Sequence, residues 1–244
     1  MPRQLLATQE ALEPRAYLAA VSFNFSTVTD LSFPASSTLP TSIVAADVNG
    51  DGKPDIIFTN TGGGYSKNGA DLGVEIADGS SSGPIQLVPG TGSYLVGPLS
   101  VADVTGDGKA DIVCGLNQAN DADGQLAVFP GNGNGAFQSP ILTPTLSGKG
   151  IAGLAIADFN GDGKPDLAVT YPDTSLVEIF LNQGNGTFAA AESFATAPSP
   201  APPVAADING DGHADLLIDS PSGAVTVLLG IGNGGFHFVE TVAP

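Results

Sequence analysis

Tryptophan is absent from this chain of 244 residues, and cationic residues are scarce. Seven Lys and Arg residues stand against 25 Asp and Glu residues, which gives a formal net charge of −18 at pH 7. Proteins that bind nucleic acids or anionic membrane surfaces need basic patches, so we expect neither of these partners. No apolar run reaches the length of a membrane-spanning helix, so membrane insertion is not expected either.

The scarcity of cysteine and histidine argues against catalysis. Cys114 is the only cysteine, and it lies in an apolar run where a small buried hydrophobe is expected rather than a nucleophile. Two histidines, His213 and His237, are too few to assemble a Ser/His/Asp or Cys/His set. Ser81 has the glycine spacing of a nucleophile elbow, but Pro84 and a β pattern follow it instead of a helix. We therefore predict that the chain is not an enzyme.

What the chain has in abundance is one nine-residue motif, Asp-x-Asn-Gly-Asp-Gly-x-x-Asp, with Thr at position 3 of its second copy. Oxygen side chains at positions 1, 3, 5 and 9 of such a turn can converge on calcium, which takes six to eight oxygen ligands. A main-chain carbonyl, expected at position 7, adds to them, and glycines at positions 4 and 6 permit positive φ. The four copies span residues 47–55, 103–111, 158–166 and 207–215. The sequence therefore predicts up to four bound calcium ions.

An EF-hand loop begins with nearly the same string, but it requires a bidentate Glu at position 12. The four copies have Phe58, Cys114, Val169 and Ile218 at that position. Short apolar runs follow each motif, and none resembles the start of an amphipathic helix. The motifs are therefore predicted to connect β-strands.

The spacing of the motifs indicates repeats, since their first aspartates are 56, 55 and 49 residues apart. Each unit has a small-residue strand before the motif, an apolar strand after it, a third strand, and a turn leading into a fourth strand. That turn reads Gly-Asn-Gly-x-Phe in three units, at residues 133–137, 184–188 and 232–236, whereas the first unit has Asp-Gly-Ser-Ser-Ser-Gly-Pro at 78–84. Four short strands in a repeat of about 50 residues are typical of a propeller blade.

The predicted fold is thus an all-β propeller of about four four-stranded blades, each with its loop between the first two strands. The blades are expected at residues 42–97, 98–150, 151–200 and 201–244. Residues 1–41 form an N-terminal extension, in which the alternating stretch 21–29 predicts a spare strand.

The repeated units resemble FG-GAP or VCBS repeats, the calcium-loop blades also found in integrin α-chain propellers and in several secreted propeller lectins. The resemblance covers roughly residues 42–243. It implies that side-chain oxygens, with the position 7 carbonyl, hold calcium. The implied ligands are Asp47, Asn49, Asp51, Lys53 and Asp55; Asp103, Thr105, Asp107, Lys109 and Asp111; Asp158, Asn160, Asp162, Lys164 and Asp166; and Asp207, Asn209, Asp211, His213 and Asp215.

The calcium ions have a physical role that follows from charge. Three carboxylates in one loop repel each other without a cation, so binding should appear as folding stability. Four ions would bring the formal charge from −18 to −10. Thr105 offers one hydroxyl in place of an amide oxygen, so the second site is expected to be weaker or to recruit a water. The alternative is that the motifs are solvated turns, which four copies in register make less favoured.

The leading functional prediction is a calcium-stabilised recognition module, lectin- or adhesion-like, that binds a glycan or a protein through loops. Sugar sites normally use aromatic platforms, for which Tyr65, Tyr94 and Tyr171 are the only candidates outside the Phe-rich core. Two alternatives stay open: a propeller enzyme or accessory domain of a secreted hydrolase or lyase, and a purely structural assembly module. Because such loops suit millimolar calcium, we expect a secreted or cell-surface protein whose leader was removed.

The prediction of four blades does not decide how the propeller ring is closed. A small four- or five-bladed ring, half of a ring completed by a second copy, and a fragment all fit the strand count. An open arc would expose apolar sheet faces, which soluble proteins cover by pairing. We therefore predict self-association, most simply as a two-fold homodimer, with a compact closed ring as the rival.

Overall fold

The structure is a computed structural model that describes residues 40–60, 71–76, 86–88, 95–117, 124–145, 150–189 and 192–242. Residues 1–30 separate from residues 31–244 as a unit of their own. The predicted N-terminal extension, except for residues 40 and 41, and its strand near residues 21–29 lie outside the described residues. Within the described ranges, no helix is long and apolar enough to cross a membrane.

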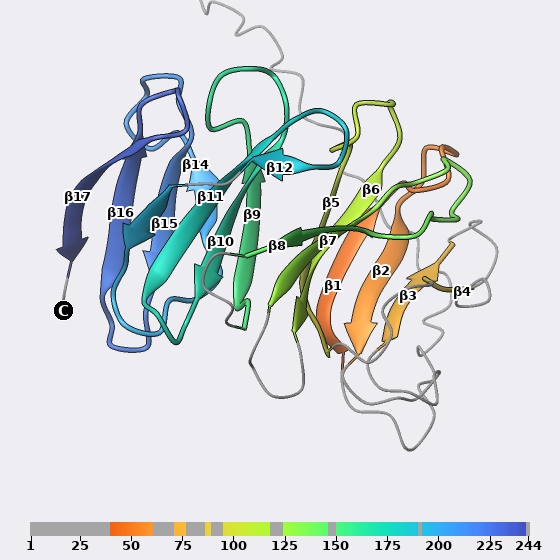
Figure 1. Ribbon diagram of the computed structural model, residues 1–244, viewed down its shortest axis with the longest axis horizontal. Coiled ribbons are helices and arrows are strands. Elements are labelled where there is room, and N and C mark those ends of the chain that lie inside the picture. The colour runs from red at the N-terminus through yellow and green to blue at the C-terminus, as the bar shows by residue number, and fades with distance from the viewer. Residues whose placement is uncertain are drawn as a thin grey trace, which may run out of the picture. The chain divides into compact units, whose positions relative to one another are not determined.

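The described residues are all β and contain no helix (Figure 1). They form four antiparallel sheets in chain order, each beginning with the strand that precedes a loop motif. The first two sheets are β1 (Pro40–Ala46), β2 (Asp55–Asn60), β3 (Asp71–Glu75) and β4 (Gln86–Leu87), then β5 (Leu95–Ala102), β6 (Asp111–Asn117), β7 (Gln125–Phe129) and β8 (Ile141–Pro144). The third is β9 (Gly153–Ala157), β10 (Asp166–Tyr171), β11 (Leu176–Asn182), β12 (Phe188–Ala189) and β13 (Ser193–Ala195), and the fourth is β14 (Val204–Ala206), β15 (Asp215–Asp219), β16 (Val225–Gly230) and β17 (Phe236–Val242).

Burial explains why the strands after the loops are continuously apolar. Every residue of β10 is buried, and so are the first six residues of β6, because both faces of these sheets are covered. A strand covered on both faces needs apolar side chains at consecutive positions rather than alternate ones. In the last sheet, β16 alternates between half-buried and buried residues, as expected of a strand covered on one face.

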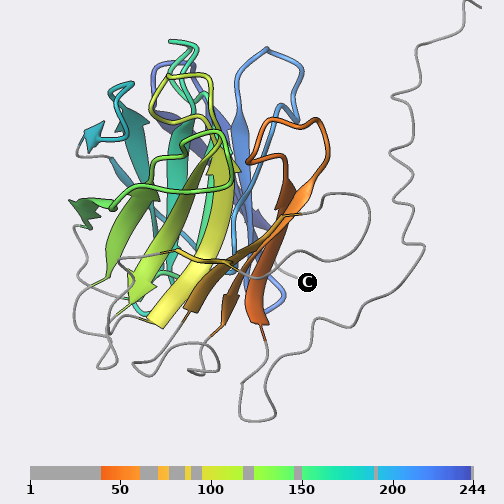
Figure 2. The same cartoon turned by 90° about the vertical axis from the view of Figure 1, so that its right-hand side faces the viewer.

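Among the described residues, three apolar cores lie between successive sheets. Figures 1 and 2 show the order of these sheets along the chain. Val48 and Ile57 of the first sheet pack with Phe129 of the second in one core. The second core joins the second and third sheets, and the third core joins the third and fourth, where Phe159 meets Phe236 edge to face at 5.6 Å. The first strands β1, β5, β9 and β14 also contact one another in that order. Each sheet is therefore stabilised by its neighbours in the chain.

The all-β class and the four-unit strand order predicted from sequence are confirmed. Two details differ. β5 begins at Leu95, before the predicted boundary at residue 98, because a register shift between Val96 and Leu99 lets the strand pass through Pro98. In the third sheet an additional strand, β13, pairs with β11 beside β12.

Candidate metal centres in four Asp-rich loops

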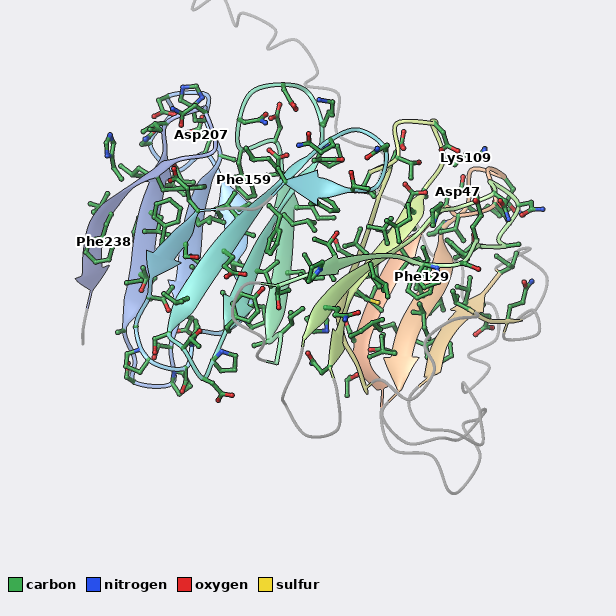
Figure 3. The ribbon with its side chains drawn as sticks, viewed as in Figure 1. Asp47, Lys109, Phe129, Phe159, Asp207 and Phe238 are labelled. Carbon is green, nitrogen blue, oxygen red and sulfur yellow. The ribbon has the colours of Figure 1, made fainter. Side chains whose placement is uncertain are left out.

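The four motifs form the loops between the first and second strands of the four sheets, joining β1 to β2, β5 to β6, β9 to β10, and β14 to β15. Asp47, Lys109 and Asp207, which are labelled in Figure 3, mark three of these loops at the upper ends of their sheets in that view. The loop positions that the sequence predicts to carry oxygen ligands are therefore repeated at the same topological point of every sheet.

Glycines at positions 4 and 6 give each loop its path. Gly50 and Gly52 have φ of 79° and 80°, and the corresponding glycines of the other three loops lie between 75° and 88°. Side chains disfavour this region, so the motif requires glycine there. A Cβ added to Gly52 would meet nothing within 4 Å, which shows that conformation rather than crowding makes this glycine necessary.

The first Asp of each loop is held by main-chain N–H groups of the same loop. Asp47 Oδ1 accepts from Gly50 N at 2.7 Å, and its Oδ2 accepts from Gly52 N at 2.8 Å. The same pair of bonds recurs in the other three loops, at 2.7 Å for Oδ1 and 2.8–3.0 Å for Oδ2. The Gly52 N–H is the largest of the causes that hold the pKa of Asp47 below its ordinary value. This carboxylate is therefore ionised and oriented by the backbone.

Positions 3 and 5 continue the same arrangement. Asn49 Oδ1 accepts from Asp51 N at 2.8 Å, and Asp51 Oδ1 accepts from Lys53 N at 2.8 Å. The second loop differs, because the Thr105 hydroxyl oxygen is buried and has no hydrogen-bond partner among the described residues. It lies close enough to Asp107 to help lower the pKa of that carboxyl, as the smallest of several causes, but outside hydrogen-bond geometry. Thr105 thus does less than Asn to organise its loop.

Position 9 is a buried anchor. Asp166 Oδ2 accepts from Phe159 N at 3.0 Å, and its Oδ1 accepts from Asn182 N at 2.8 Å, at the end of β11. Asp111 and Asp215 tie their loops to Gly131 and Gly230 in the same way. Burial is the main cause that raises the pKa of Asp166, against the two N–H donors that lower it. This residue therefore fastens the loop to the third strand of its sheet.

The lysine at position 7 has a second role that the motif did not predict. Lys109 Nζ lies 2.9 Å from Asp107 Oδ2, and Lys164 Nζ lies 2.8 Å from Asp162 Oδ2. The lysine side chain is the main cause that lowers the pKa of its partner carboxyl in both loops. Lys53 stands 4.0 Å from Asp51 Oδ2. The sequence signal was the spacing Asp-Gly-Lys, which puts a cation two residues after an anion.

Among the described residues, no three His, Cys, Asp or Glu side chains gather tightly enough to hold a metal ion. The reason is visible in the loops, where carboxylate oxygens turn to main-chain N–H groups. The donor set nevertheless fits calcium: each loop offers three carboxylates and the side-chain oxygen of an Asn or Thr, which are hard ligands. A carboxylate that accepts three N–H bonds, as that of Asp47 does, still has acceptor capacity on one of its oxygens. The unpartnered Thr105 hydroxyl adds an oxygen with unused acceptor capacity in the second loop.

The hairpin that enters the fourth strand is a further part of the site that the sequence reasoning missed. Gly135 N donates to Val48 O at 3.0 Å, Gly186 N to Val104 O at 3.1 Å, and Gly234 N to Phe159 O at 2.9 Å. Each bond joins the Gly-Asn-Gly-x-Phe turn of one sheet to position 2 of the loop in the preceding sheet. The recurrence of the same turn in three units was the sequence signal for this contact.

The candidate residues outside the loops are three tyrosines, Ser81 and Cys114. Tyr171 is fully buried in the core between the second and third sheets, so it is not available as an aromatic platform for a sugar. As the last residue of β10, it points into the core although the sequence places it beside a turn. Tyr65, Tyr94 and Ser81 lie outside the described residues. Cys114 is fully buried, and burial raises the pKa of its thiol to about 12, which confirms the structural role predicted for it.

Family models match most of the repeated region. A model described as an FG-GAP-like repeat matches residues 103–169 and again 158–218, and one described as an FG-GAP repeat matches residues 39–73. These matches contain all four loop motifs.

Solved structures also align with the chain. One is the Tc holotoxin pore of Photorhabdus luminescens, with 18% identity over 79% of this chain and 12% of that chain, and a TM-score of 0.40. Another is the biofilm matrix protein Bap1 of V. cholerae, with 22% identity over 84% of this chain and 31% of that chain, and a TM-score of 0.42. The chain therefore spans less than a third of either solved chain.

Proposed function

Because the chain belongs to the FG-GAP repeat family, we propose that it is a calcium-binding β-propeller module that recognises a ligand outside the cell without catalysing a reaction. The observation that carries the proposal is the repetition of one loop, four times, with the same N–H bonds to the first Asp and the same positive-φ glycines. A solvated turn has no need to preserve its side-chain geometry so closely from copy to copy.

The residues that would hold calcium are those of positions 1, 3, 5 and 9 and the carbonyl of position 7. Calcium supplies positive charge that offsets three neighbouring carboxylates and links the two ends of the loop. The chain's own N–H groups pre-orient position 1, because both oxygens of Asp47, Asp103, Asp158 and Asp207 are already fixed by backbone donors. At position 5 the lysine must leave the carboxylate of Asp107 or Asp162 for both its oxygens to be available.

The loops would transmit this stabilisation to the junctions between sheets. In the first three loops, the carbonyl of position 2 accepts from a hairpin of the next sheet. Ordering the loop therefore also orders the surface against which the next sheet packs. Ligand binding to the folded state alone raises stability by mass action, so calcium should stabilise the whole array.

A protein ligand is better supported than a glycan. Glycan sites use exposed aromatic faces, tryptophan is absent, and Tyr171 is buried. The loops and hairpins, by contrast, present many main-chain and Asp or Asn groups at one end of the sheets, as protein contacts require. If these loops bind calcium as extracellular modules do, with dissociation constants of about 10⁻⁴–10⁻³ M, the ion would be bound outside the cell, and we propose secretion or surface display.

Binding assays with and without calcium test the recognition role. The chain is applied to a glycan microarray and to immobilised extracellular matrix proteins in about 2 mM CaCl₂, a concentration suited to extracellular modules, and then in excess EDTA. The proposal predicts ligand binding in calcium that EDTA abolishes. Release of new reducing ends from the arrayed glycans would contradict the non-catalytic role, and binding that is equal in both buffers would contradict the role of calcium.

A further inference from the structure

A hollow of about 460 Å³ lies beside the first strands of the four sheets and is separate from the Asp-rich loops. Its lining includes residues from every sheet, among them Ser42 of β1, Val96 of β5, Leu154 of β9 and Pro202, two residues before β14. Each first strand ends at its loop, and these residues lie at or near the beginnings of the strands, so the hollow is toward the end of the sheets that is remote from the loops. Ligand pockets have volumes of about 300–1,000 Å³, so the hollow is large enough for a ligand.

The first strands depart from regular pairing where they line the hollow. In β5 a register shift sets Gly97 and Pro98 opposite Gly115 alone. In β1 a register shift leaves Thr41 outside the ladder pairs. Bulges of this kind re-aim the strand and are frequent beside binding sites, because the extra residue is released from the ladder. The main-chain groups of Thr41 and Gly97 are thus placed at the hollow without a ladder partner.

The lining carries no charge. None of the ten residues around the hollow is Asp, Glu, Lys, Arg or His, although the chain has a formal net charge of −18. Two of them, Val96 and Leu99, are 1% and 7% exposed, so an apolar part of the lining is also the most enclosed. A charged ligand group would lose hydration there without gaining a partner of opposite charge. The hollow therefore favours an uncharged, apolar ligand.

The polar side chains of the lining are mostly engaged within the protein. Asn117 Oδ1 accepts from Ile151 N at 2.9 Å, and Asn117 Nδ2 donates to Ile151 O at 3.3 Å. Thr41 Oγ1 and Thr59 Oγ1 share a hydrogen bond of 2.9 Å. Ser42 alone brings a side-chain hydroxyl that is not engaged within the described ranges. A sugar, with its many hydroxyl groups, would leave most of them unpaired here, whereas apolar side chains need no such partners.

We propose that this hollow holds an extended, uncharged and apolar segment of a partner protein. The inference rests on the proposed recognition function, and it names the place and the chemistry of that recognition. Apolar side chains of the segment pack on Val96, Leu99 and Leu154. The main chain of the segment bonds to the groups that the bulges release, as in other modes of extended-peptide recognition, and the Ser42 hydroxyl adds one bond. Calcium stabilises the sheets from their other end without contacting the segment.

Peptide selection and binding test the proposal. A phage-displayed library of short random peptides is selected on the immobilised chain in CaCl₂, and synthetic copies of the selected peptides are titrated by fluorescence polarisation. Uncharged, apolar sequences are expected to be enriched. Pro202→Asp puts a charge at an exposed lining position and should weaken their binding at least about tenfold, whereas Pro202→Ala should weaken it much less. Ser42→Ala should weaken binding about three- to tenfold through the loss of one hydrogen bond.

Leu142→Asp is the matched control, because Leu142 is 46% exposed on β8 and does not line the hollow. It should bind the peptides as the original chain does, and circular dichroism verifies that each variant is folded. Enrichment of charged peptides, or of none above background, would overturn the proposal. Apolar peptides that bind Pro202→Asp and Ser42→Ala as tightly as the original chain would overturn it too, since they would bind elsewhere.

The same variants separate this site from the recognition function itself. Calcium-dependent binding to a matrix protein that Pro202→Asp leaves unchanged would retain the function and overturn the site. Peptide binding at the hollow without any calcium-dependent binding of a matrix protein or glycan would retain the site and contradict the function. Binding of an arrayed glycan that Pro202→Asp abolishes would assign the hollow to a sugar and overturn the choice of a protein segment.

Discussion

At the scale of single residues, some loop oxygens already accept backbone N–H bonds, and others are paired with a lysine that calcium would have to displace. Both oxygens of the position 1 carboxylate accept backbone N–H bonds, and position 9 is buried against the third strand. In two loops the position 5 carboxylate is paired with the lysine of position 7. Each role makes a separate prediction, because each residue can be changed without altering the strand pattern.

Asp51→Ala removes the position 5 carboxylate of the first loop. We expect calorimetric calcium stoichiometry to fall by one and the calcium-bound melting midpoint to fall by roughly 3–6 °C. Asp173→Ala is the matched control, because Asp173 is an exposed aspartate in the turn between β10 and β11, outside every loop. Unchanged stoichiometry in Asp51→Ala would remove Asp51 from the ligand set.

Lys164→Met tests the competition between lysine and calcium. Lys164 Nζ lies 2.8 Å from Asp162, an exposed pair whose attraction is weak, so its loss should raise calcium affinity of the third loop about two- to fivefold. Lys53→Met is the control, since its ammonium lies 4.0 Å from Asp51 and has less to release. Calorimetry at low salt measures both, and a weaker third site in Lys164→Met would show that the lysine supports binding.

At the scale of elements, the positions of the strands could be predicted from local sequence patterns, but the contacts between sheets could not. Apolar runs after each Asp motif placed β2, β6, β10 and β15, and the Gly-Asn-Gly-x-Phe turns placed the fourth strands, because local periodicity and turn chemistry decide those features. The bond from Asn182 to the Val104 carbonyl joins residues 78 apart, and no local pattern encodes it. Tyr171 was misplaced for the same reason, since the sheet that buries it is remote in sequence.

The loop set was predicted only in part. The glycines at positions 4 and 6 predicted the positive φ values that are observed there. The motif also predicted that position 1 supplies a carboxylate to the loop. The anchoring role of position 9 depends on N–H groups of the third strand, as in the bond from Asn182 to Asp166, and so on tertiary structure. Calcium itself stays a prediction.

Gly234→Ala tests the hairpin that docks on the third loop. Gly234 has φ of 87°, and an added Cβ would lie 3.1 Å from Leu181 Cδ2, so backbone strain and crowding should cost about 1–3 kcal/mol. Gly212→Ala has nearly the same φ, 88°, with nothing within 4 Å, and isolates the backbone cost. Urea unfolding in EDTA should show a larger loss for Gly234→Ala. Equal losses would mean that the hairpin contact contributes little.

At the scale of the whole molecule, the negative charge is concentrated in the repeated loops. Twelve of the 25 acidic residues are loop aspartates, so much of the net charge of −18 is concentrated where calcium is proposed to bind. Without the cation this charge opposes the compact state, and with it the four loops become links between strands and, through the hairpins, between sheets.

The most direct test of calcium as the stabilising cofactor is the thermal unfolding midpoint of the chain in excess EDTA and in about 2 mM CaCl₂, followed by circular dichroism. Four sites with extracellular affinities should raise the midpoint by roughly 10 °C or more in calcium, and renewed chelation should reverse the shift. Magnesium at the same concentration is the control, and it should give a much smaller shift because it binds such flexible oxygen sites poorly. Identical melting curves in calcium and EDTA would contradict the account.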